Sequence, residues 1–272
     1  MFKKDMSTKF EMSDLGLLTY YLGIEVNQHE EGVSLKQEAY AKALLDKTRM
    51  KACNSTRAPM ENKLKLRKKE AGELVDPTEY RSIVGALRYL THTRPDISFA
   101  VGIVSRFMEK PMLEHLQAVK CILRYVKGTV NFGLEYTKGK EKVTLTGYSD
   151  SDMGNDVNER KSTGGMVFYI NNNLITWASQ KQRCVALSSC EAEFMAATLA
   201  ACQGIWLRRL TSEITGQKVP PVKLLVDNKS ALELMKNPVF HGRSKHIDIR
   251  FHFIRECVEN GYIIVTHVDS KE

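Results

Sequence analysis

The stretch Val143-Thr-Leu-Thr-Gly-Tyr-Ser-Asp150 decides the fold, because the hydrophobic pattern changes there from a helical to a strand-like period. Its β-branched and aromatic residues are typical of a β-strand, and the strand ends on a carboxylate. Two further strands are predicted at 165–170 and 174–179, joined by a turn at Asn171-Asn172-Asn173. We therefore expect three antiparallel strands from residue 143 onward.

Downstream of these strands, helical and extended segments alternate. The pattern predicts a long helix from 189 to about 214, a strand at 222–226 and a short helix at 230–235. A last helix at about 247–258 and a strand at 262–267 complete the chain. This order predicts an α/β fold with a mixed five-stranded sheet flanked by helices.

The first half of the chain is predicted to be mainly helical. Apolar residues recur at helical spacing between residues 76 and 130, and Arg94-Pro95-Asp96 is a typical helix start. Upstream, the residue pattern predicts a short strand-and-helix module at residues 17–26 and 33–45. The basic segment 63–69 is poor in apolar residues, so we expect an exposed, mobile connection, although phosphate contact is an alternative.

Length and composition bound the class of protein. The length of 272 residues is typical of about two globular domains. A composition with 43% hydrophobic and 26% charged residues excludes a wholly disordered protein. The net charge of +8 favours a polyanionic partner such as nucleic acid. We expect no membrane segment, because no apolar stretch reaches the roughly 20 residues that a bilayer requires. We also expect no secretory signal, and six scattered cysteines that stay reduced.

Three acidic residues are candidates for chemistry. Asp150 and Asp227 each end a predicted strand, and Glu193 lies in the first turns of the long helix. Carboxylates from strand ends and a helix can converge at a sheet edge, and their oxygens suit Mg²⁺. In two-metal sites, ions about 3.5–4 Å apart hold the attacking and leaving oxygens of a phosphodiester.

Other residues compete for these roles. Ser188-Ser-Cys-Glu191 fits a capping box, so Glu191 has a structural function and Glu193 is the preferred ligand. Asp152 and Asp156 follow the first strand and are expected to be solvated loop residues. A metal site formed by His246, Asp248 and His252 is disfavoured, because these residues would face outward from a helix. Trp177 and Trp206 are expected in the core, although an exposed aromatic residue could stack on a base.

Eight linked motifs carry a resemblance to a known family. The second half holds Tyr148-Ser-Asp-Ser-Asp152, Lys161-Ser-Thr-Gly-Gly165, Trp177-Ala-Ser-Gln-Lys-Gln182, Ala186-Leu-Ser-Ser-Cys-Glu-Ala-Glu193, Val226-Asp-Asn-Lys-Ser-Ala231 and Lys245-His-Ile-Asp-Ile-Arg-Phe-His252. The first half holds Phe10-Glu-Met-Ser-Asp-Leu-Gly-Leu-Leu18 and Tyr80-Arg-Ser-Ile-Val-Gly-Ala-Leu-Arg-Tyr-Leu90. Together they resemble copia-type retrotransposon Pol polyproteins, with a C-terminal part of reverse transcriptase at 1–140 and a ribonuclease H-like domain at 141–272.

The resemblance implies an activity and a set of ligands. Asp150, Glu193 and Asp227 match the metal-binding carboxylates of the family, which implies Mg²⁺ (or Mn²⁺) and hydrolysis of the RNA strand of an RNA–DNA hybrid. The expected products carry a 3′-hydroxyl and a 5′-phosphate. The candidates for phosphate contact are Lys181, Arg183, Lys229, Arg243 and Lys245. The remaining Pol domains are possible partners, in cytoplasmic virus-like particles or in the nucleus.

Two departures from the family pattern qualify the expected activity. The sequence contains no Asp-Asp dipeptide, so we expect no DNA synthesis by this chain alone. Ribonucleases H of this type place a fourth carboxylate after the last strand, where this sequence has only Val268-Asp-Ser-Lys-Glu272, and Asp269 lies too near the strand end. The sequence therefore leaves three alternatives open: an impaired nuclease, an inactive nucleic-acid-binding remnant, or a decayed reading frame.

Overall fold

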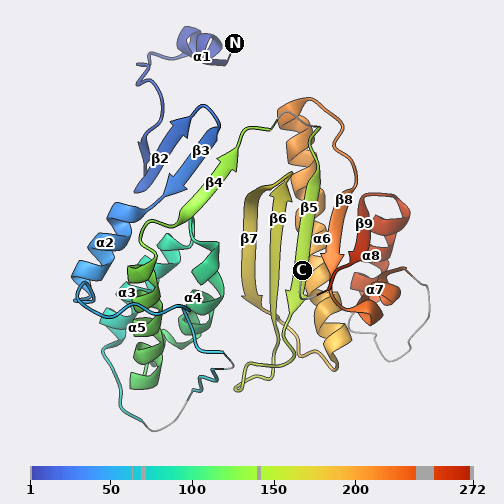
Figure 1. Ribbon diagram of the computed structural model, residues 1–272. Coiled ribbons are helices and arrows are strands. Elements are labelled where there is room, and N and C mark those ends of the chain that lie inside the picture. Colours follow the sequence, from blue (N-terminus) through green and yellow to red (C-terminus); the bar gives the residue numbers. More distant parts are fainter. Residues whose placement is uncertain (1, 63, 69–71, 140–141, 237–247, 270–272) are drawn as a thin grey trace.

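The computed structural model describes residues 2–62, 64–68, 72–139, 142–236 and 248–269 and forms two lobes (Figure 1). The first lobe begins with α1 (Phe2–Lys9). Its antiparallel sheet has the order β1-β2-β3-β4. These strands are β1 (Tyr20–Tyr21), β2 (Ile24–His29), β3 (Gly32–Lys36) and β4 (Gly133–Thr137).

Helices form the body of the first lobe below this sheet (Figure 1). They are α2 (Glu38–Lys47), α3 (Pro77–Leu90), α4 (Ser98–Val104) and α5 (Leu113–Gly128), with short 3-10 turns η1 (Pro95–Ile97) and η2 (Ser105–Phe107). Their apolar stripes meet in one core that includes Val84, Leu87 and Val119, all fully buried. The predicted helical unit is therefore confirmed, although the predicted start at Pro95 is a 3-10 turn and α4 itself begins at Ser98.

Two local predictions for this lobe need correction. The predicted strand-and-helix module is a three-stranded meander followed by α2, and the sequence pattern missed β4, which pairs with β3 over a large sequence separation. The exposure predicted for the basic segment is confirmed at Lys65, Arg67 and Lys68, but two contacts anchor the segment to the protein. Leu66 is buried in the helical core, and the Lys68 amide donates to Asn158 Oδ1 at 2.8 Å.

The second lobe contains the predicted mixed five-stranded sheet, in the order β7-β6-β5-β8-β9. Its strands are β5 (Leu145–Ser151), β6 (Thr163–Ile170), β7 (Asn173–Lys181), β8 (Val222–Val226) and β9 (Ile263–His267). The first three are antiparallel, whereas β8 and β9 run parallel to β5. The helices are α6 (Ser189–Thr215), α7 (Lys229–Lys236) and α8 (Asp248–Glu259).

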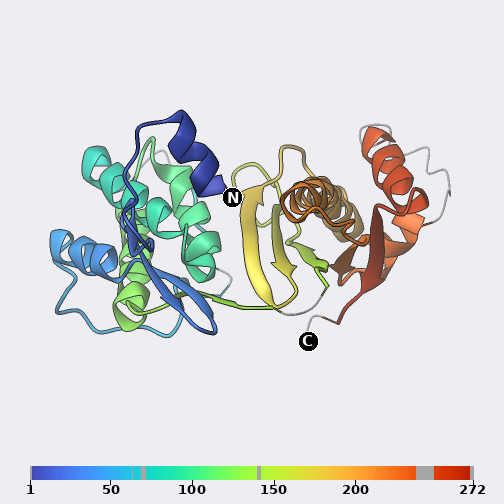
Figure 2. The ribbon, with the colours of Figure 1, turned by 90° about the horizontal axis from the view of Figure 1, so that it is seen from above.

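The long helix α6 covers one face of this sheet (Figure 2). Close packing depends on Phe168 of β6, which is fully buried and fills the space left by Gly147 on β5 and Gly204 on α6. A β-carbon at Gly147 would lie far inside van der Waals contact with the Phe168 ring. The missing side chains therefore let α6 approach the strands that carry the acidic residues.

The two lobes contact each other through polar side chains. The Arg106 guanidinium, just after α4, pairs with Asp156 at 3.3 Å and donates to Thr163 Oγ1 at 2.9 Å. At the other end, the Thr137 amide of β4 donates to Asn173 Oδ1 at 2.8 Å. These contacts fix β7 and the loop after β5 against the first lobe. Within the described ranges, none of the helices combines the length and apolarity needed to cross a bilayer.

Candidate metal centre

Strand register places two of the acidic residues next to each other. The parallel strands β5 and β8 pair Ser149 with Val226, so Asp150 and Asp227 are the residues that follow on neighbouring strands. Asp150 lies near the end of β5, and Asp227 follows the last residue of β8 directly. Because parallel strands end at the same edge of a sheet, both carboxylates emerge at one place.

The third carboxylate comes from the beginning of α6. The Ser188 hydroxyl caps this helix by accepting from the Glu191 amide at 3.2 Å, which fixes where the helix begins. Glu193 follows in the second turn, points toward the sheet edge and is only 5% exposed. Its Oε1 accepts a hydrogen bond from the Ser151 amide at 2.9 Å, which ties the helix to the end of β5.

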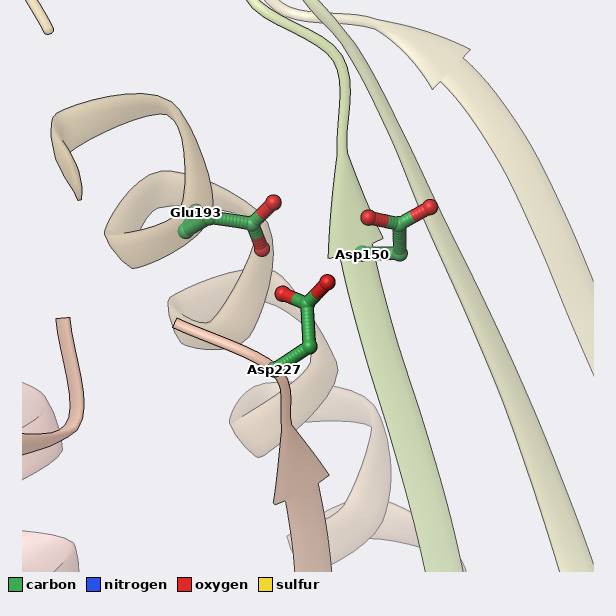
Figure 3. Close-up of side chains that lie close together, drawn as sticks. All are labelled: Asp150, Glu193 and Asp227. Atoms are coloured by element: carbon green, nitrogen blue, oxygen red, sulfur yellow. The ribbon is translucent and has the colours of Figure 1, made fainter. Parts of the chain in front are cut away.

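The three carboxylates converge (Figure 3). One oxygen of each lies within 4.8 Å of one oxygen of each other. Two oxygens on opposite sides of a single Mg²⁺ are about 4.2 Å apart, so this spacing suits oxygen ligands that share one ion or a close pair of ions. Glu193 Oε2 is buried and meets no amide or hydroxyl donor among the described residues. A buried carboxyl oxygen that receives no hydrogen bond fits a cation ligand, so the set of three carboxyl groups suits a hard divalent ion.

The electrostatics of the cluster favour the same interpretation. Burial raises the pKa of Glu193 to about 8, and the nearby charges of Asp150 and Asp227 add to this effect against the Ser151 hydrogen bond. Solvent reaches Asp150, yet the surrounding protein atoms and the Asp227 carboxylate raise its pKa as well. Like charges held together in this way are costly without a counter-charge, which a divalent cation would supply.

The competing acidic residues have structural partners. Glu191 Oε2 accepts from the Leu187 amide at 2.9 Å, so the capping interaction exists but reaches one residue further back than the predicted box. Asp152 Oδ1 accepts from the Thr163 amide at 3.1 Å. Burial alone would raise the pKa of Asp156, but amide hydrogen bonds and the Lys181 ammonium outweigh it and lower that pKa. These residues shape the loop and the helix end rather than the acidic cluster.

The five basic residues predicted to contact phosphate differ in their exposure and ion pairs. Lys181 is held in ion pairs with Asp156 at 3.1 Å and Glu159 at 2.6 Å. Arg183 is exposed after β7, and Lys229 is exposed at the start of α7, two residues after Asp227. Arg243 and Lys245 lie outside the described residues, as does His246 of the disfavoured metal site. His252 is exposed on α8.

A groove that the sequence pattern did not reveal leads to Asp150. It has a volume of about 220 Å³ and lies between α4 and the sheet, with Phe99, Tyr148 and Trp177 in its lining. Register places Tyr148, Val167 and Trp177 in one row across the three antiparallel strands, and Asp150 with Gly165 and Ser179 in another such row. Tyr148 and Phe99 are 41% and 48% exposed. The expectation that Trp206 lies in the core is wrong, because this side chain is 55% exposed on α6.

The chain is similar to known retrotransposon proteins. A family model described as "Reverse transcriptase (RNA-dependent DNA polymerase)" matches residues 1–62. The chain is 41% identical over 268 residues to the "Retrovirus-related Pol polyprotein from transposon RE1" of Arabidopsis thaliana, which covers 98% of this chain. The chain spans only 18–21% of the length of the curated Pol polyproteins that it matches.

Two solved structures are similar to this chain at low sequence identity. The first is a foamy viral protease-reverse transcriptase in complex with double-stranded DNA, with a TM-score of 0.50 at 14% identity. The match covers 92% of this chain and 44% of the viral chain. The second is LC11-RNase H1 in complex with an RNA/DNA hybrid, with a TM-score of 0.36 at 14% identity. The match covers 47% of this chain and 87% of the LC11-RNase H1 chain. With about 40% identity over nearly its whole length, the chain belongs to the family of copia-type retrotransposon Pol polyproteins.

Proposed function

We propose that this chain hydrolyses the RNA strand of an RNA–DNA hybrid in a reaction that depends on a divalent metal ion. The observation that carries the proposal is the convergence of Asp150, Glu193 and Asp227 at one sheet edge, with a buried Glu193 oxygen that lacks a donor among the described residues. Membership in a Pol family adds the substrate class, because reverse transcription produces such hybrids.

The roles of the residues follow from their placement. Glu193 is held from two directions, by its helix and by the Ser151 amide, so it would be the most rigid ligand. Asp150 is open to solvent on the groove side, where a phosphodiester can approach. Asp227, directly after β8, supplies the third carboxylate and faces both (Figure 3). When bound there, Mg²⁺ would activate a water molecule and stabilise the charge that develops on the phosphate oxygens.

The surroundings of the cluster support a nucleic-acid substrate. The aromatic groove residues Tyr148, Phe99 and Trp177 offer faces on which sugars and bases can pack. Lys229, two residues after Asp227, and Arg183, just after β7, are exposed cations, and the chain as a whole carries a charge of +8. Phosphate contacts of this kind would make hybrid binding weaken as salt rises.

Two broader proposals concern the whole chain. Residues 1–140 and 141–272 would be a reverse-transcriptase part and a ribonuclease H-like part, because the two apolar cores lie on opposite sides of this boundary. The other Pol domains would be its partners, in virus-like particles or in the nucleus.

Cleavage of a labelled hybrid by wild-type protein, Asp150→Asn and Asp152→Asn tests the proposed activity. Asp150→Asn removes a ligand charge and should lower the rate by at least about a hundredfold. Asp152→Asn is the matched control, because an asparagine Oδ1 can still accept the Thr163 amide, and it should retain most of the activity.

The same experiment separates hydrolysis from binding alone. Hybrid affinity without cleavage, equal in wild-type protein and Asp150→Asn, would support the inactive binding remnant instead. Cleavage that both variants retain would indicate a contaminating nuclease and contradict the assignment.

A further inference from the structure

One buried glutamine connects three elements beside the acidic cluster. Gln182 follows β7 and is only 6% exposed. Its backbone amide donates to the Ser162 carbonyl at 2.8 Å, and its side-chain Nε2 donates to the Ala192 carbonyl at 2.8 Å and to Ser151 Oγ at 3.1 Å. The same residue therefore contacts the start of β6, the end of β5 and the first turn of α6.

Both side-chain contacts lie one step from Glu193. Ala192 precedes Glu193 in α6, so the bond to the Ala192 carbonyl fixes the helix turn from which Glu193 projects. Ser151 carries the amide that donates to Glu193 Oε1, and it follows Asp150 in β5. Two hydrogen bonds from one nitrogen thus hold a strand end and a helix start at a fixed separation.

The geometry fixes how the Gln182 amide is oriented. The Ala192 carbonyl can only accept a hydrogen bond, so Nε2 must face it and Oε1 must face away. Oε1 is buried and has no hydrogen-bond partner among the described residues. This orientation is therefore unfavourable for the free energy of folding at that atom. Gly164 lies beside this amide. A β-carbon there would make an ordinary contact of 3.6 Å with Gln182 Nε2 and a tight one of 3.2 Å with the Ala196 β-carbon, so the glycine matters mainly for the approach of α6.

We propose that Gln182 is a positioning residue of the metal centre, which fixes the first turn of α6 against the end of β5 and thereby places Glu193 opposite Asp150. This inference rests on the proposed function. Residues that orient metal ligands in this way commonly change metal affinity or activity by about 10–100-fold when they are replaced.

Binding of Mn²⁺ without substrate, followed by electron paramagnetic resonance, tests the proposal. Gln182→Met keeps the length of the side chain and removes both donated hydrogen bonds, so Mn²⁺ should bind about tenfold or more weakly. Gln180→Met is the matched control, because Gln180 lies two residues earlier, on β7, with an exposed side chain, and it should bind like wild type. In hybrid cleavage, Gln182→Met should lower kcat and leave the KM for the hybrid unchanged.

A milder variant covers the case in which Gln182→Met does not fold. Ser151→Ala removes the hydroxyl that accepts from Gln182 but keeps the amide that holds Glu193, so it should weaken Mn²⁺ binding severalfold in the same direction. Wild-type affinity in whichever of these variants folds would overturn the positioning role. If wild-type protein binds Mn²⁺ no better than Asp150→Asn does, the metal centre itself is wrong, and both proposals fall for that separate reason.

Discussion

At Glu193, two requirements oppose each other. The carboxyl group is 5% exposed beside two other carboxylates, which disfavours its ionised form, whereas a metal ligand must be ionised. Burial accordingly raises its pKa to about 8. The metal-free protein therefore keeps a proton that the metal would replace, and two predictions follow from this competition.

The first prediction concerns stability without metal. Unfolded Glu193 ionises near 4.5, so between this pH and about 8 the folded state binds a proton that the unfolded state lacks. The free energy of unfolding should fall as pH rises through this window and level off above it. Glu193→Gln removes the effect and should stabilise the protein at pH 8 in EDTA by about 1–3 kcal/mol, measured by urea unfolding. At pH 4 the two proteins should be nearly equal. A less stable Glu193→Gln at pH 8 would contradict a raised pKa.

The second prediction concerns metal affinity. Since the metal displaces the Glu193 proton, Mn²⁺ affinity should rise between pH 6 and pH 8, by at most about tenfold per pH unit, and then level off. Isothermal titration calorimetry in buffers of different ionisation enthalpy should also detect a released proton at pH 7. Affinity that does not change across this range would exclude Glu193 as a ligand that must lose a proton.

Among the secondary-structure elements, prediction from sequence succeeded where local pattern decides. Strand β5 and helix α6 were predicted within a few residues, because β-branched runs and the Ser188 cap act locally. Strand β4 was missed, since its partner β3 lies about a hundred residues earlier and only tertiary contact defines the pair. The sequence pattern predicted Glu193 as a ligand. It could not reveal the contacts of Gln182 or the groove, because these depend on side chains from separate strands and helices.

The close approach of α6 to the sheet gives a third prediction. Gly147→Ala would force a β-carbon into the buried Phe168 ring and should destabilise the protein by about 1–3 kcal/mol. Gly85→Ala is a control of opposite sign. Gly85 is exposed within α3, and an added β-carbon meets nothing within 4 Å among the described residues, so this change should stabilise by about 0.5–1 kcal/mol. Thermal unfolding measures both, and equal effects would contradict the packing described for Phe168.

For the whole molecule, the contacts that join the two lobes include an ion pair between Arg106 and Asp156. Their side chains are 15% and 4% exposed, so this ion pair is shielded from solvent far more than a surface pair. Because Phe99 and Pro95 of the first lobe line the groove beside Asp150, the lobe contact also defines the path to the acidic cluster. Loss of this contact should affect both stability and substrate binding.

A double-mutant cycle supplies the fourth prediction. Arg106→Met leaves Asp156 paired with Lys181 and should destabilise by about 1–3 kcal/mol, with a coupling energy to Asp156→Asn of at least about 0.5 kcal/mol. Arg88→Met, at an exposed arginine on α3, should change stability by less than about 0.5 kcal/mol. Equal effects of the two arginine variants in urea unfolding would show that the lobes do not depend on this contact.

The most direct test of the metal centre is a crystal soaked in Mn²⁺ and measured at a wavelength where manganese scatters anomalously. We expect anomalous density enclosed by the carboxylates of Asp150, Glu193 and Asp227, absent from Asp150→Asn crystals treated in the same way. Well-ordered crystals of the folded protein with these three carboxylates apart, or with manganese bound only elsewhere, would contradict the account.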